Sequence, residues 1–162
     1  MAAVDFFLKL DGVDGESTDD QHKNELDIES FSWGLSNSGS AAHAGGGGRG
    51  KASFQDFHFT APVSRASPKL FLACASGQHI PTATLTCRKA GGSQQEFMVI
   101  KMTDILISDY QLGGDETSEA LPMEQVSMNY SKVEFEYRPQ RADGMLEASV
   151  KAGWDVGKNV KI

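Results

Sequence analysis

Apolar residues recur at every second position in several segments of this chain, and this spacing constrains the fold more than any other feature. Between residues 82 and 88 apolar residues alternate with threonines and Arg88, and shorter alternating segments lie at 4–10 and 57–60. A period of two sends successive side chains to opposite faces of a strand. Each segment therefore predicts a half-buried β-strand, and Arg88 is expected on the polar face of its strand.

The alternation slips by one residue at two places. In residues 25–34 the frame changes near Glu29, which turns Phe31 and Trp33 inward and leaves Ser32 outward, and a second slip lies near Ser131. An extra residue of this kind is typical of a β-bulge or of a bend at a barrel corner. Two further strands are expected over 97–102 and 105–112.

One segment, residues 67–77, predicts a short helix. Ser67 can cap the free amides, Pro68 suits the first turn, and Gly77 can adopt the left-handed conformation that ends a helix. Its inner face is expected to carry Leu70, Phe71 and Cys74. Roughly eight strands and one helix predict a single domain over 1–162 with a mainly β fold. The expected form is a twisted β-barrel or closed two-sheet sandwich.

Residues 34–51, GLSNSGSAAHAGGGGRGK, contain almost nothing that could fill a core. Gly45, Gly50 and Lys51 match the spacing of a phosphate-binding loop, but Ala52 stands where that motif needs a hydroxyl. A phosphate loop also opens a helix, whereas the residues that follow here alternate like a strand. We therefore predict a long extended loop that requires a partner surface.

Composition and the remaining motifs exclude several classes of function. The net charge of −7 and the lack of a basic stripe argue against binding to nucleic acid or to an anionic membrane. The histidines show no metal-ligand spacing, and no catalytic motif is present, so we predict no enzyme, metal or cofactor. Cys74 and Cys87 are expected to be buried thiols in a reducing compartment. The N-terminal residues do not form a signal peptide, because Asp5 and Lys9 interrupt their apolar stretch.

Motifs along the whole chain resemble one known family. They are Val4–Lys9, Gly15–Ser17, Phe31–Gly34, Ser38–Lys51, Phe59–Thr60, Pro68–Gly77, His79, Pro81, Arg88–Gly92, Tyr137–Gln140, Ala142–Gly144 and Gly153–Trp154. Each is weak alone, but in this order they closely resemble the haemolysin-coregulated protein (Hcp) family, which builds the inner tube of type VI secretion systems.

The resemblance implies a homohexameric ring that stacks into a tube, with spike protein, sheath and soluble effectors as further partners. It implies a protein that is made in the cytoplasm and secreted without a signal peptide. Ser32 is expected to contact effectors in the lumen, although an ordinary solvent-facing strand residue is an equal alternative. Contacts between subunits or rings are expected at Ser38, Gly39, Ser40, Gly45, Gly46, Gly47, Gly48, Lys51, Gly91 and Gly92.

Two other interpretations stay open at this point. The first is a monomeric β-sandwich that binds a ligand such as a glycan, which would need an exposed aromatic platform. Trp33 and Trp154 lie in apolar alternation instead. The second is a nucleotide-dependent enzyme that uses Lys51.

Overall fold

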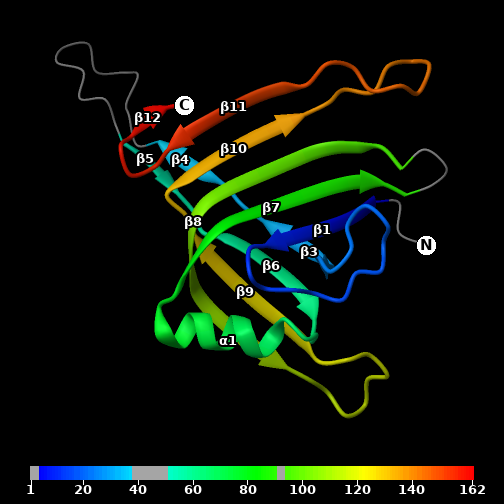
Figure 1. Ribbon diagram of the computed structural model, residues 1–162, viewed down its shortest axis with the longest axis vertical. Coiled ribbons are helices and arrows are strands. Elements are labelled where there is room, and N and C mark those ends of the chain that lie inside the picture. The colour runs from blue at the N-terminus through cyan, green and yellow to red at the C-terminus, as the bar shows by residue number, and fades with distance from the viewer. Residues whose placement is uncertain (1–3, 38–50, 91–93) are drawn as a thin grey trace.

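The computed structural model describes residues 4–37, 51–90 and 94–162 (Figure 1). Within them the elements follow one another in this order: β1 Val4–Leu10, β2 Leu26–Ile28, β3 Ser30–Ser32, β4 Leu35–Asn37, β5 Ala52–Phe54, β6 Phe57–Pro62, α1 Ser67–Ser76, β7 His79–Lys89, β8 Glu96–Gly113, β9 Met123–Asn129, β10 Lys132–Tyr137, β11 Val150–Asp155 and β12 Val160–Lys161.

The strands form two antiparallel layers that share β8. One layer runs β12-β11-β10-β8-β7-β1-β2, and the other continues from β8 through β9 and β6 to β3. β4 and β5 form a separate two-stranded ribbon at one end of the molecule (Figure 1). α1 lies against the second layer and contacts β8. The mainly β fold with one short helix is confirmed.

The two layers make a sandwich and not a fully closed barrel. The short strands β2 and β3 are consecutive in the chain, but β2 pairs with β1 of the first layer and β3 pairs with β6 of the second. The break between them falls at Glu29, whose amide donates to the carbonyl of Thr60. The bend expected near Glu29 is therefore confirmed, and it is the point where the chain passes from one layer to the other.

β8 is one continuous strand, whereas two were expected. Its first half pairs with β7 and β10, and its second half pairs with β9. The inward frame changes from Ile100 and Met102 to Ile105 and Ile107. Asp104 absorbs the change with a φ of 57°, a left-handed conformation that aspartate tolerates better than most residues. The bulge predicted near Ser131 is wrong, because the chain there leaves the second layer as β9 and enters the first as β10.

The helix ends as predicted but begins differently. Gly77 has a φ of 69° and its amide donates to the carbonyl of Ala73. Ala66 and not Ser67 is the N-cap residue, and the Ser67 hydroxyl accepts a hydrogen bond from the Ser64 amide. The predicted inner face is wrong at Phe71, which is 60% exposed, because Leu70 and Ala73 are the residues buried on the sheet.

The core lies between the layers and follows the alternation of the strands. Phe57, Phe59, Leu8, Leu85 and Met128 are among its fully buried side chains. Cys87 is buried as expected, while Cys74 on α1 is only half-buried, and both thiols are free.

Candidate functional site: exposed surfaces and a buried polar cluster

The structure describes two of the residues expected to make contacts, Ser32 and Lys51. Both are exposed. The other predicted contacts, Ser38, Gly39, Ser40, Gly45, Gly46, Gly47, Gly48, Gly91 and Gly92, lie outside the described residues. Lys51 directly precedes β5, at the end of the β4–β5 ribbon where Asn37 pairs with Ala52, while Ser32 lies on β3. The two residues therefore belong to different surfaces.

Ser32 belongs to a polar surface across β3, β6 and β9. It pairs with His58 on β6, whose Nδ1 lies 3.1 Å from the hydroxyl of Ser127 on β9. Ser30, two residues before Ser32, is hydrogen-bonded through its hydroxyl to Thr60. This surface offers hydroxyl and imidazole groups that can form hydrogen bonds with a polar partner.

An apolar groove of about 670 Å³ lies between the β4–β5 ribbon and strands β10 and β11. Leu35 and Phe54 of the ribbon face Phe135 and Trp154 of the sheet across it, and Trp33 also lines it. Neither tryptophan is fully exposed, so neither forms the open aromatic platform that a glycan-binding module would need.

A buried tyrosine fixes the ribbon beside this groove. Tyr130 is 5% exposed, and its hydroxyl donates to the carbonyl of Gln55, 2.8 Å away, at the turn between β5 and β6. The same hydroxyl accepts a hydrogen bond from the indole nitrogen of Trp33, and the ring of Phe54 packs edge-on against Tyr130. These contacts hold the base of the extended loop in one orientation.

The apolar stripe formed by Leu35, Phe135, Tyr137 and Val150 continues outward from the groove. Along β10 the same face is buried at Val133, 38% exposed at Phe135 and 46% exposed at Tyr137. Val150, which pairs with Tyr137 on β11, is 67% exposed. The core-facing side of the β10–β11 pair thus keeps its apolar pattern after it leaves the core of the molecule.

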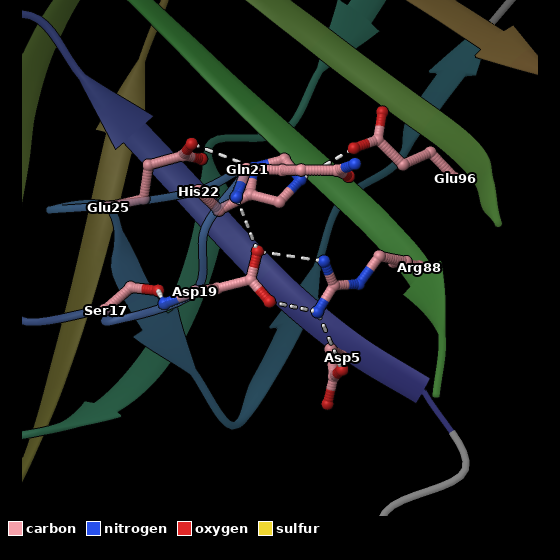
Figure 2. A network of polar contacts seen from close by, with 8 residues as sticks. All are labelled: Asp5, Ser17, Asp19, Gln21, His22, Glu25, Arg88 and Glu96. Atoms are coloured by element: carbon pink, nitrogen blue, oxygen red, sulfur yellow. Dashed lines mark hydrogen bonds and ion pairs between the residues drawn. The ribbon is translucent and has the colours of Figure 1, made fainter. Parts of the chain in front are cut away.

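A second feature is a buried polar cluster that fastens residues 14–25 to the first layer (Figure 2). Arg88 on β7 is only 2% exposed and donates to both carboxylate oxygens of Asp19, at 3.0 and 2.6 Å. It also reaches Asp5 on β1 at 3.4 Å and lies 4.8 Å from the centre of the Phe7 ring. The two hydrogen bonds from Arg88 hold the pKa of Asp19 at about 2.

His22 forms the other half of the cluster. Its Nδ1 lies 2.8 Å from Glu25 and its Nε2 lies 2.7 Å from Glu96 at the start of β8. The imidazole stacks on the face of Phe7, with ring centres 4.4 Å apart. The cluster therefore joins residues 14–25 to the three strands β1, β7 and β8.

Sequence reasoning placed Arg88 on the polar face of its strand but missed the cluster that buries it. The alternation around Arg88 is correct, but residues 14–25 cover the polar face of β7 there and bury both Arg88 and Thr86. An arginine on a strand and an acid-rich segment are visible in the sequence. No pattern, however, indicates which carboxylate the arginine meets.

The described residues contain no group of three or more side chains placed to hold a metal ion. Their one helix, α1, is too short to cross a membrane.

Relatives of known family share this fold over nearly the whole chain. A family model described as "Type VI secretion system effector, Hcp" matches residues 7–137. The protein Hcp1 of Pseudomonas aeruginosa is 44% identical over 98% of this chain and 99% of its own length. The crystal structure of Hcp1 from Salmonella typhimurium is 37% identical, with a TM-score of 0.80 over 99% of this chain and 100% of that one. A structure described as a type six secretion system protein is 34% identical, with a TM-score of 0.92 over the same shares. The chain therefore belongs to the Hcp family of secreted type VI secretion system proteins.

Proposed function

We propose that this protein is the structural subunit of a type VI secretion inner tube, in which six copies form a ring and rings stack end to end. The apolar stripe is the observation that carries the proposal. Contiguous exposed apolar surface on a monomer marks an interaction site, because leaving it in water is unfavourable. Family membership makes a second copy of the chain the natural partner.

A ring requires two different surfaces on each subunit that fit one another. Such head-to-tail contacts close into a ring when the rotation between subunits fits. The apolar stripe supplies one of these surfaces. The β4–β5 ribbon is held by Tyr130 beside the stripe and carries the glycine-rich segment 38–50 between its two strands. We propose that this loop contributes to contacts with neighbouring subunits or rings.

The polar surface around Ser32 supports a carrier role in the same assembly. We propose that it lines the lumen and contacts soluble effectors, and that the protein protects them before secretion. The sheath and the spike are the proposed partners outside and at the tip of the tube. The protein acts in this proposal through assembly and binding, without catalysis, after export that uses no signal peptide.

Native mass spectrometry and electron microscopy of the purified chain test the ring. The wild type should be a hexamer with an open centre, and the double substitution Phe135→Ser and Tyr137→Ser should shift it to monomers. Leu72→Ser is the matched control, because Leu72 is 59% exposed but lies on α1, away from the stripe. A wild-type chain that stays monomeric at every concentration would contradict the proposal.

A separate experiment addresses the lumen. Ser32→Gln adds bulk on the polar surface and should reduce co-purification of effectors while the hexamer persists. Ser36→Gln on β4 is the control, because Ser36 is also an exposed strand serine but lies on the ribbon. Equal loss of effectors in both variants would argue against Ser32 as a cargo contact.

A further inference from the structure

His22 is held by two carboxylates at once. Its side chain is 8% exposed, and its two ring nitrogens lie within 2.8 Å of Glu25 and Glu96. Ionised carboxylates only accept hydrogen bonds, so both contacts are made only when both ring nitrogens carry a proton. Neutral imidazole has one N–H, whereas the imidazolium has two. The observed arrangement is therefore the one that suits the cationic form.

The charges around His22 reinforce this requirement. Its own segment contributes Asp19 and Glu25, β8 contributes Glu96, β7 contributes Arg88, and Asp5 on β1 reaches the cluster through Arg88. Arg88 is already engaged by Asp19 and Asp5. Asp27 on β2 adds a further carboxylate, and its burial together with Asp5 and Asp19 raises its pKa. Five carboxylates thus share two cationic side chains, and a neutral His22 would leave Arg88 as the one cation among them.

We propose that protonated His22 is a latch that fastens residues 14–25 to the start of β8, and that loss of its proton opens the latch. The exposures of the two carboxylates decide which bond breaks. The side chain of Glu25 is 12% exposed and that of Glu96 is 40% exposed, so Glu96 is the one that water can solvate readily. Neutral His22 keeps its bond to Glu25 in the same segment and releases Glu96 on β8.

The release is local, because a second fastening does not depend on His22. The bidentate pair between Arg88 and Asp19 joins the same segment to β7 and stays ionised throughout the range in which imidazoles titrate. Opening the latch therefore loosens residues 14–25 and the start of β8 while the sandwich remains folded. The latch belongs to the subunit itself and works whether or not the subunit forms a ring.

Hydrogen exchange of the full chain, followed by mass spectrometry from about pH 5.5 to about pH 8.5, tests the latch. After correction for intrinsic exchange rates, peptides from residues 14–25 should lose protection about tenfold as pH rises, the effect of one hydrogen bond to a charged group. His22→Gln should abolish this pH dependence. His79→Gln is the matched control, because His79 also bonds a carboxylate, Asp104, but is 61% exposed.

Glu96→Gln provides a second variant if His22→Gln does not fold. Its side-chain amide can accept from or donate to the imidazole, so residues 14–25 should stay protected across the pH range. The proposal is overturned if wild-type protection does not change with pH. It is also overturned if the folded variants at His22 and Glu96 keep the wild-type pH profile, or if His79→Gln removes it.

Discussion

Replacing Asp19 with asparagine removes the carboxylate that neutralises Arg88 and leaves a guanidinium that is 2% exposed without its main partner. Hydrogen bonds from Arg88 are the largest cause of the lowered Asp19 pKa, which falls from 3.8 to about 2, while partial burial of the carboxylate opposes this change. Because the side chain is 20% exposed, most of the interaction escapes screening by solvent. The shift corresponds to about 2 kcal/mol of folding free energy at neutral pH.

The sign of the pH dependence follows from a folded-state pKa that is lower than the unfolded one. The stabilisation by Asp19 is fully present above the unfolded value of 3.8 and is lost as pH falls towards about 2. The asparagine of the variant cannot titrate, so the variant lacks this contribution at every pH. The difference between wild type and variant should therefore be largest at neutral pH and should shrink in acid.

Urea denaturation followed by tryptophan fluorescence measures both expectations. At neutral pH Asp19→Asn should lower the free energy of unfolding by about 2 kcal/mol, and the loss should become small near pH 2. The control is Asp20→Asn, because Asp20 is the exposed neighbour of Asp19. A loss below about 0.5 kcal/mol at neutral pH, typical of surface ion pairs, would refute the reasoning, as would a loss that does not change with pH.

Three further changes probe other parts of the fold. Gly15→Ala would place a methyl group 2.5 Å from a backbone carbonyl and should cost about 1–3 kcal/mol in thermal unfolding, while Gly113→Ala, which meets no atom within 4 Å, should cost far less; equal losses would contradict this. Burial raises the pKa of Cys87 to about 12, so Ellman's reagent should modify only half-buried Cys74 in the native protein, and rapid reaction of both thiols would be inconsistent with the buried site. Tyr130→Phe removes the hydrogen bonds to the Trp33 indole nitrogen and the Gln55 carbonyl and should cost about 1–3 kcal/mol in urea denaturation, whereas unchanged stability would show that the ribbon is held in another way.

The strands were predictable because alternation is a local property of the sequence. The break at Glu29 was also visible, since a change of inward frame leaves a trace in the order of apolar residues. The continuity of β8 was not visible, because Asp104 crosses the frame change in a left-handed conformation that sequence does not indicate. The frame change near Ser131 has the same cause as that at Glu29, because at both places the chain passes from one layer to the other. The sequence indicated a bulge at Ser131 because nothing in it shows that the next strand joins the other layer.

The candidate surfaces were harder to predict because they depend on what covers each strand. The exposed position of Ser32 follows from alternation and is confirmed, but its role in binding effectors remains a prediction. Arg88 follows the same rule of alternation and is nevertheless buried, because residues 14–25 fold over it. Phe135 and Tyr137 show the opposite case. They continue an inward-facing pattern beyond the point where the core ends.

The sharing of β8 by both layers has a consequence for how the protein comes apart. Neither layer can separate from the other and keep all its strands paired, because β8 is hydrogen-bonded to strands of both layers. Partial openings should therefore begin at the periphery, at β12 or the β4–β5 ribbon, and stop before β8. The amides of β8 should open only with the whole chain and so report its global free energy of unfolding. The subunit is in this sense one cooperative unit, with its most protected strand at its centre.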